Sequence, residues 1–214
     1  MLQIKLFRFN HFGENTYLLY SNDGDCFVID PGNSTPAEDE KLFSFIDGNG
    51  LTPKLIINTH AHVDHIVGNA ALAKRYNIEV AAHTDTAVDF AVAENVIGMY
   101  GFDRSINIKK ADRILEDGET LPLGDGQVEV IATPGHAKGS ISLYVPTECV
   151  VFTGDALFCR SIGRTDLPGG NYEELRTSIR ERLFTLPDET MVMPGHDEAT
   201  SIGEEKDFNP YVAV

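Results

Sequence analysis

Histidine and aspartate side chains stand at the ends of four apolar segments. The run at residues 55–59 leads into the hexamer HAHVDH, and three further apolar runs each lead into one histidine or aspartate. Strand ends can aim side chains from distant positions at one point, and adjacent glycines permit the sharp turns that this requires. The pattern therefore predicts a metal site built from His60, His62, Asp64, His65, His136, Asp155 and His196.

The types of these side chains limit which metal ions the site can bind. Imidazoles and carboxylates without a cysteine suit Zn²⁺, Fe²⁺ or Mn²⁺, and seven donors are too many for one tetrahedral zinc. Two divalent ions per chain are therefore expected, and zinc is favoured. The expected division gives His60, His62 and His136 to one ion and Asp64, His65 and His196 to the other, with Asp155 between them.

The composition of the chain argues against several classes of function. The 214 residues include 17 lysines and arginines against 33 aspartates and glutamates, so the formal charge is −16, which opposes binding to nucleic acid or to an anionic membrane surface. No apolar stretch approaches the roughly 20 residues that cross a bilayer. The three cysteines lack CxxC spacing and do not predict a disulfide framework. We expect one domain over residues 1–214, cytoplasmic, acting on a small molecule as a monomer or small homo-oligomer.

The elements that must position these side chains follow from the apolar patterns. Strands are expected at residues 4–9, 15–20 and 26–29, and then a helix that begins near Pro36. Further strands are expected at 55–58, 80–82, 128–132, 140–145, 150–153 and 191–193, with helices at 66–76, at 84–96 and after the cap residue Asn171. The helix at 84–96 is expected to bury Val88, Ala91 and Val92, and residues 112–119 to form a hairpin and loop. Two groups of strands with helices predict two packed sheets flanked by helices.

The motifs HAHVDH, TPGH, TGDALF and PGH, in this order, resemble those of the metallo-β-lactamase superfamily. The resemblance covers nearly the whole chain. It implies an α+β fold, the four-layer αβ/βα sandwich, with a binuclear metal site at one edge. It also implies that Asp30, in the segment Asp30-Pro31-Gly32, hydrogen-bonds a ligand histidine or stabilises the metal loop.

Within the superfamily, the stretch TGDALFCRSIGRTDLPGGNYEEL and the final NPYV are most similar to the glyoxalase II-like hydrolases. These enzymes cleave S-acylglutathione thioesters such as S-lactoylglutathione in methylglyoxal detoxification. Their aspartate at position 155 replaces the cysteine of binuclear zinc β-lactamases, which argues against an antibiotic hydrolase. Two departures are noted. The C-terminal helical domain that contacts glutathione in those enzymes is not expected here, and the acids Asp197 and Glu198 stand where similar hydrolases continue with Gly-Pro.

The resemblance implies a mechanism. Two divalent ions would lower the pKa of a bridging water, and the resulting hydroxide would attack the thioester carbonyl. Asp64 and Asp155 are the expected catalytic residues, because they would hold the second ion and the hydroxide. The expected substrate contacts, which supply local positive charge for an anionic thiol, are Arg160, Arg164, Lys138 and Tyr172.

Three alternatives stay open. The first is a mononuclear iron persulfide dioxygenase acting on glutathione persulfide, with His60, His136 and Asp155 as ligands, since such enzymes carry a stretch like that at residues 163–166. The second is a lactonase. The third is a non-catalytic metal-binding domain that retains the fold. Metal content, measured together with activity on S-lactoylglutathione, separates these possibilities.

Overall fold

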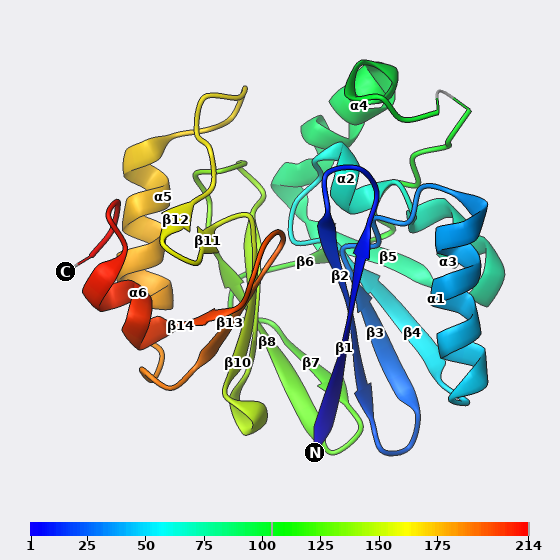
Figure 1. Cartoon of the computed structure of the whole chain (residues 1–214), viewed down its shortest axis with the longest axis horizontal. Coiled ribbons are helices and arrows are strands. Elements are labelled where there is room, and N and C mark those ends of the chain that lie inside the picture. The colour runs from blue at the N-terminus through cyan, green and yellow to red at the C-terminus, as the bar shows by residue number, and fades with distance from the viewer. Residues whose placement is uncertain (104, 214) are drawn as a thin grey trace.

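Two six-stranded sheets pack face to face, and helices cover both outer faces, in a computed structural model that describes residues 1–103 and 105–213 (Figure 1). This arrangement confirms the expected α+β four-layer sandwich of the metallo-β-lactamase type. In the described part of the chain, no helix combines the length and apolar character needed to span a membrane.

The first sheet changes from antiparallel to parallel along its strand order. Its first three strands form an antiparallel meander, and the next three join in parallel. Parallel strands end at a common edge, so the loops that follow them lie together. The strands are β1 (Leu2–Phe9), β2 (Glu14–Ser21), β3 (Asp25–Ile29), β4 (Thr52–Ile57), β5 (Glu79–His83) and β6 (Arg113–Leu115).

Helices α1 (Pro36–Gly48) and α3 (Asn69–Tyr76) cover the outer face of this sheet (Figure 1). Thr35 caps α1 by accepting a hydrogen bond from the Glu38 backbone N–H, and Pro36 occupies the first turn, where its missing N–H costs nothing. Leu42 and Ile46 of α1 are buried against the sheet. The expected helix after Pro36 is therefore confirmed.

The second sheet repeats the arrangement on the other side. Its strands, in sheet order, are β14 (Thr200–Ser201), β13 (Met191–Pro194), β10 (Val150–Gly154), β9 (Ile141–Val145), β8 (Gly126–Ala132) and β7 (Thr120–Leu123). Its outer face packs against α5 (Tyr172–Ser178), which continues into a π-helical turn (Ile179–Leu183), and against α6 (Ile202–Phe208). A short hairpin of β11 (Leu157–Phe158) and β12 (Ser161–Ile162) follows β10.

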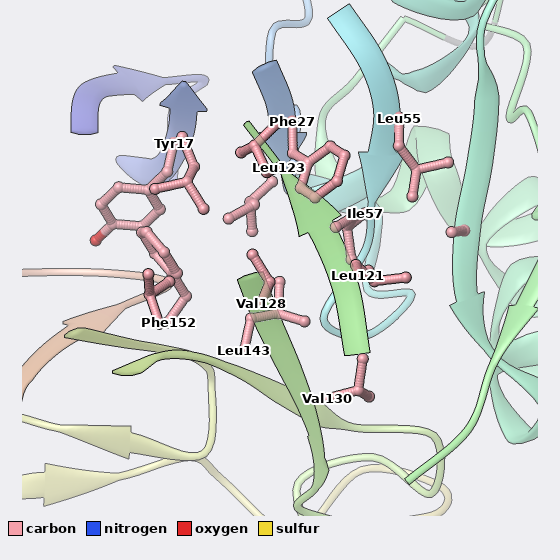
Figure 2. Packing of buried hydrophobic residues seen from close by; sticks show 14 of the residues in the cluster. Tyr17, Phe27, Leu55, Ile57, Leu121, Leu123, Val128, Val130, Leu143 and Phe152 are labelled. Carbon is pink, nitrogen blue, oxygen red and sulfur yellow. The ribbon is translucent and has the colours of Figure 1, made fainter. Parts of the chain in front are cut away.

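The main core lies between the two sheets (Figure 2). Phe27 and Ile57 of the first sheet face Val128 and Leu143 of the second, and all four are buried. Burying one such side chain contributes about 1.5–3 kcal/mol, so this layer fixes the sheets against each other. The strand ends that carry the metal-binding residues are thereby held in place.

The structure corrects the expected inner face of the helix at 84–96. This segment is a 3₁₀ turn (Thr84–Thr86) followed by α4 (Ala87–Val96), and its buried residues are Phe90 and Ala93. Val88, Ala91 and Val92 are exposed instead, Val88 by 70%. Apolar residues lie on all sides of this helix, so their spacing cannot show which side is buried. The correct face is fixed by packing against Ala61 and Ile66.

Other elements also differ from expectation. Part of residues 112–119 forms strand β6, which pairs in parallel with β5 rather than folding into a hairpin. The helix expected at 66–76 is two helices, α2 (Val63–Ile66) and α3. Helix α6 was not expected, although Ser201 followed by Glu204 is a capping pattern. The remaining short turns are 3₁₀ helices at Ile97–Tyr100 and Pro146–Glu148.

Candidate metal centre

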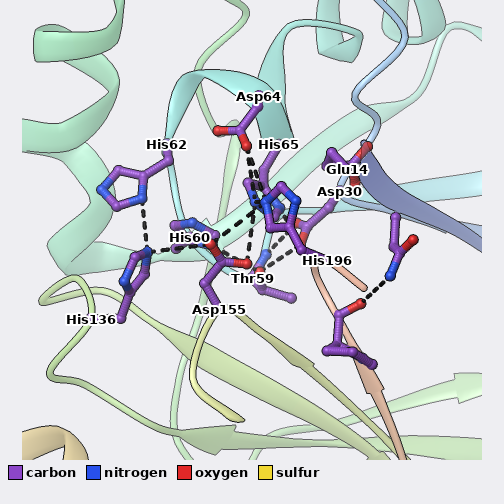
Figure 3. Close-up of polar contacts among 12 residues, drawn as sticks. Glu14, Asp30, Thr59, His60, His62, Asp64, His65, His136, Asp155 and His196 are labelled. Carbon is purple, nitrogen blue, oxygen red and sulfur yellow. Dashed lines mark hydrogen bonds and ion pairs between the residues drawn. The ribbon is translucent and has the colours of Figure 1, made fainter. Parts of the chain in front are cut away.

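All seven predicted metal-binding side chains meet at the edge where the strands of both sheets end (Figure 3). The loop after β4 and the short helix α2 supply His60, His62, Asp64 and His65. The loops after β8, β10 and β13 supply His136, Asp155 and His196, respectively. Segments as far apart as residues 60 and 196 therefore contribute to one cluster.

Six of the side chains form two groups of three, in the expected division. Within each group the potential ligand atoms lie within 4.8 Å of one another. In the first group, His62 Nδ1 and His136 Nε2 are 2.8 Å apart. In the second, His196 Nε2 is 3.2 Å from both His65 Nε2 and Asp64 Oδ2. The groups are His60, His62 and His136, and Asp64, His65 and His196.

Asp155 lies between the two groups. Its Oδ1 is 3.4 Å from His65 Nε2, and its Oδ2 is 3.7 Å from both His136 Nε2 and His196 Nε2. One carboxylate therefore faces both sets of imidazoles. This is the position that a bridging ligand requires.

Two buried polar atoms of the cluster have no hydrogen-bond partner among the described residues: His60 Nε2 and Asp155 Oδ1. An unsatisfied buried acceptor costs about 1–3 kcal/mol, and a cation bound among these atoms would remove that cost. Nitrogen and carboxylate donors directed at a shared space are the ligands that divalent transition metals prefer. The residues present thus fit divalent metal ions.

The electrostatics keep His60, His62 and Asp155 in forms that can bind a metal. Burial, reinforced by the neighbouring imidazoles of His65 and His62, lowers the pKa of His60 well below its ordinary value, and burial together with His136 lowers the pKa of His62 to about 4. Both rings are therefore neutral at pH 7. Burial alone would raise the pKa of Asp155, but the adjacent His65 holds it well below its ordinary value. Asp155 is therefore ionised.

Asp30 contacts two residues of the loop that carries the first cluster histidines. Its carboxylate accepts hydrogen bonds from the Thr59 N–H at 2.7 Å and from Thr59 Oγ1 at 2.6 Å, and its Oδ2 lies 3.2 Å from His65 Nδ1. A proton on Nδ1 leaves the Nε2 lone pair of His65 for the cluster. The contact with a cluster histidine is the one expected for Asp30.

Two glycines allow the loops to approach this closely. A Cβ at Gly195 would lie 2.3 Å from Asp155 Oδ1, and one at Gly163 would lie 1.9 Å from the Asp155 carbonyl oxygen. Any larger residue at either position would displace Asp155. The Pro-Gly pair before His196 indicates the first constraint in the sequence, whereas no sequence pattern links Gly163 to Asp155.

Several supporting residues were missed by sequence reasoning. Asn58 Nδ2 donates to the His65 carbonyl, and Asn15 Nδ2 donates to the carbonyls of Pro194 and Asp197 on either side of His196. These bonds tie strand β2 and the residue after β4 to the metal-binding loops. A lone buried asparagine gives no sequence signal, because its partners are distant backbone groups.

The expected substrate contacts fall into two sets. Arg160 donates to the carbonyl and to Oε2 of Glu204 and lies over the Phe208 ring, and the Tyr172 hydroxyl donates to the carbonyl of Tyr211. These two side chains are therefore engaged with the C-terminal segment.

Arg164 and Lys138 lie closer to the cluster. The backbone carbonyl of Arg164 is 2.8 Å from His136 Nδ1, and its guanidinium binds Asp166 through two hydrogen bonds of 2.8 Å. Lys138 follows His136 by two residues and passes beside Gly169. Of the four residues, Arg164 contacts a cluster histidine through its backbone, and Lys138 is the nearest to that histidine in sequence.

The two acids after His196 have different surroundings. Glu198 forms an ion pair with Arg8 at 2.7 Å, so its charge is largely compensated. The backbone carbonyl of Asp197 accepts hydrogen bonds from Arg8 and Asn15. The segment of Asp197 and Glu198 therefore fixes the loop that carries His196.

Comparison with known proteins gives a consistent result. The family model described as "Metallo-beta-lactamase superfamily" matches residues 10–196. A relative from Bacillus subtilis, "Probable metallo-hydrolase YqgX", is 40% identical over 92% of each chain. Another from Haemophilus influenzae, "Hydroxyacylglutathione hydrolase GloC", is 32% identical over 99% of this chain and 98% of its own length.

Solved structures agree with this result. The structure described as the B3 metallo-beta-lactamase BLEG-1 is 36% identical, with a TM-score of 0.87 over 99% of this chain and 100% of the other. TTHA1623 in a di-iron-bound form is 34% identical, with a TM-score of 0.85 over 97% and 99% of the two chains. Both similarities extend over almost the full length of the chain.

Proposed function

Because the chain belongs to the metallo-beta-lactamase superfamily, we propose that it is a metal-dependent hydrolase that cleaves the thioester of S-(2-hydroxyacyl)glutathiones such as S-lactoylglutathione. The cluster of histidines and aspartates and the relative described as a probable metallo-hydrolase support hydrolase chemistry. The observation that carries the thioester assignment is the similarity, over almost the full length of both chains, to the hydroxyacylglutathione hydrolase GloC.

The proposed cofactor is a pair of divalent ions, with zinc favoured and iron or manganese as alternatives. The two groups of three ligands on either side of Asp155 support a pair, and the di-iron form of TTHA1623 supports iron as the alternative to test. When bound, the ions would acidify a water molecule and polarise the carbonyl of the substrate.

The chain's own groups prepare the site for this chemistry. His60 and His62 remain neutral, so their nitrogen lone pairs can face the centre. Asp30 favours a proton at His65 Nδ1, and a bound metal would displace the proton at Nε2. Asp64 and Asp155 supply negative charge that holds cations in place. The leaving thiolate has a pKa near that of cysteine, about 8.5, so its departure needs no strongly acidic side chain.

A second candidate function is the iron-dependent oxidation of glutathione persulfide. It would require two histidines and one aspartate on one iron, and His136 Nε2 does lie 3.7 Å from Asp155 Oδ2, with the His60 ring next to that of His136. Against it, Asp64, His65 and His196 form a second complete group that a mononuclear site would not use.

The test is a substrate panel with the purified, metal-loaded protein and its Asp155→Asn variant. We expect hydrolysis of S-lactoylglutathione, and a loss of at least 100-fold in kcat/KM in the variant, because Asp155 faces both groups of ligands. His83→Ala, a histidine outside the cluster, is the control and should retain activity. Oxygen consumption with glutathione persulfide, or faster turnover of a homoserine lactone or a β-lactam, would contradict the proposal. A metal-loaded protein inert to all of these would favour a non-catalytic role.

A further inference from the structure

Glu14, the first residue of β2, is a buried acid that the proposed chemistry does not use. Its side chain is 0% exposed, and its Oε1 has no hydrogen-bond partner. Its Oε2 lies only 2.0 Å from the point where a Cβ at Gly32 would stand, so the carboxyl packs directly on the backbone after Asp30. Figure 3 shows Glu14 beside Asp30, on the side of the cluster away from His62.

Among the residues that the structure describes, the Glu14 side chain has one hydrogen-bond partner, Thr16, whose hydroxyl has three polar neighbours. Thr16 Oγ1 is 2.8 Å from Glu14 Oε2, 2.9 Å from the Asp30 carbonyl oxygen and 2.9 Å from the Gly32 nitrogen. The Gly32 N–H can only donate, so Thr16 Oγ1 accepts from it. The Asp30 carbonyl can only accept, so it needs the one proton of the hydroxyl.

Because Thr16 has only one hydroxyl proton, these contacts determine the protonation state of Glu14. If Glu14 were a carboxylate, it and the Asp30 carbonyl would compete for one hydroxyl proton, and one buried acceptor would be left unpaired at a cost of about 1–3 kcal/mol or more. If Glu14 carries a proton on Oε2, it donates to Thr16 Oγ1, and Thr16 donates to Asp30. All three contacts are then satisfied.

We propose that Glu14 is a positioning residue. It is a neutral carboxylic acid that donates a hydrogen bond to Thr16 and thereby fixes the Asp30–Gly32 turn next to the metal-binding cluster. Asp30 has a left-handed backbone, with φ of 47°, which a non-glycine residue holds only when its surroundings enforce it. Asp30 in turn contacts Thr59 and His65. Glu14 therefore acts on His65 through two intermediate residues.

The charges around Glu14 agree with a neutral acid. Burial, joined by the negative charges of Asp30 in the turn after β3 and of Asp64 on α2, raises the pKa of Glu14 well above its ordinary value, and His65 only partly opposes this. The hydrogen-bond count leads to the same state without reference to these charges. The inference concerns the metal centre and holds for any substrate.

The test compares the zinc affinity of the metal-free protein and its variants by chelator competition. Glu14→Gln keeps a donor toward Thr16 and should retain zinc affinity within about 3-fold. Glu14→Ala removes the donor and should weaken zinc binding by about 10–100-fold, as for other groups that orient metal ligands. If Glu14→Gln binds zinc as weakly as Glu14→Ala, or if Glu14→Ala binds like the wild type, the proposal is wrong.

Two further measurements test the role of Glu14 if the Glu14→Ala variant does not fold. Thr16→Val removes the central hydroxyl and should weaken zinc binding by about 10-fold or more. Thr190→Val is its matched control, because Thr190 is also buried and its hydroxyl has no partner. The infrared difference between wild type and Glu14→Gln at pH 7 should contain a protonated carboxyl band, and a carboxylate band in its place would overturn the proposal. Failure of thioester hydrolysis alone would leave this result unchanged.

Discussion

His65 connects the supporting residues to the metal centre. Its Nδ1 lies against Asp30, and its Nε2 lies within 3.6 Å of Asp64 and Asp155. Burial alone would lower the pKa of His65, but the charges of Asp155 and Asp64 and the bond to Asp30 raise it well above its ordinary value. In the metal-free protein His65 is therefore a cation, and a bound metal must displace its Nε2 proton.

This charge state predicts how the stability of the metal-free protein depends on pH. His65 and Glu14 both have raised pKa values in the folded protein, so each contributes stability below its unfolded pKa, about 6.5 and 4.3, and that contribution is lost as pH rises through the folded value. The loss is at most about 1.4 kcal/mol per pH unit for each group. The Tm of the metal-free protein should therefore fall between pH 7 and pH 9.

The Glu14→Gln variant separates the two contributions. Its Tm should fall less steeply over the same range, because Glu14 no longer contributes and the slope that remains comes from histidines with raised pKa values, His65 and His196. Asp64 and Asp155, whose pKa values are lowered, are ionised throughout this range and add no slope. Equal slopes for variant and wild type in a calorimetric pH series would contradict the state assigned to Glu14.

Arg164 gives a second prediction for single residues. Its guanidinium is held by Asp166, and the hydrogen bonds from Arg164 lower the pKa of Asp166 to about 2, so the pair stays intact at any pH of interest. If Arg164 binds the anionic thiol part, Asp166→Asn should free it and lower KM for S-lactoylglutathione by a few-fold, and Arg164→Ala should raise KM by about 10-fold. Asp188→Asn, which breaks the pair with Lys206, is the control. Unchanged KM values would remove Arg164 from the site.

The residues that could be predicted from the sequence differ physically from those that could not. The seven cluster residues follow apolar runs and share a chemical type, so their pattern is visible without coordinates. Glu14 and Thr16 act through single contacts with the turn at Asp30, and nothing in their spacing indicates those contacts. Arg160 and Tyr172 form hydrogen bonds with the C-terminal segment, and the sequence does not indicate these contacts for the same reason.

At the scale of elements, helix α6 holds the loop after Asp155. Glu205 of α6 is fully buried and accepts hydrogen bonds from the Arg160 N–H, from Thr200 Oγ1 and from Asn209 Nδ2. Asn209 also donates to the Ser161 carbonyl. The hairpin of β11 and β12 is therefore tied to α6 through one buried carboxylate and one amide.

Removing that carboxylate should destabilise the fold more than removing its exposed neighbour. Glu205→Ala should lower the free energy of unfolding by about 2–4 kcal/mol, because it removes the acceptor of three donors, one of which belongs to the fully buried Asn209. Glu204→Ala, which breaks the exposed pair with Arg160, should cost about 1 kcal/mol or less. Urea unfolding of both variants measures the difference, and equal losses would contradict the role of α6.

The elements could be predicted where one face is apolar and the other polar. Residues 36–48 show this pattern and form α1 as expected, whereas the apolar residues of α4 lie all around the helix, so the wrong face was chosen. Strand β6 was missed because a three-residue strand is defined by its partner β5 and not by its own sequence. Long-range contacts, packing for α4 and strand pairing for β6, account for both errors and are absent from local patterns.

At the scale of the whole molecule, the acidic surface and the metal centre have opposite effects on an anionic substrate. The chain carries a formal charge of −16, and two divalent ions would offset only a small part of it. The substrate must therefore be attracted by local positive charge at the centre, where the sheets bring the ligands together.

The most direct test of the central claim is a zinc titration of the metal-free protein while S-lactoylglutathione hydrolysis is followed. Two complete groups of ligands on either side of Asp155 predict that activity rises to its maximum at two equivalents of zinc per chain. Maximal activity at one equivalent, or no hydrolysis with two zinc ions bound, would contradict the claim that this cluster is a two-metal thioester hydrolase.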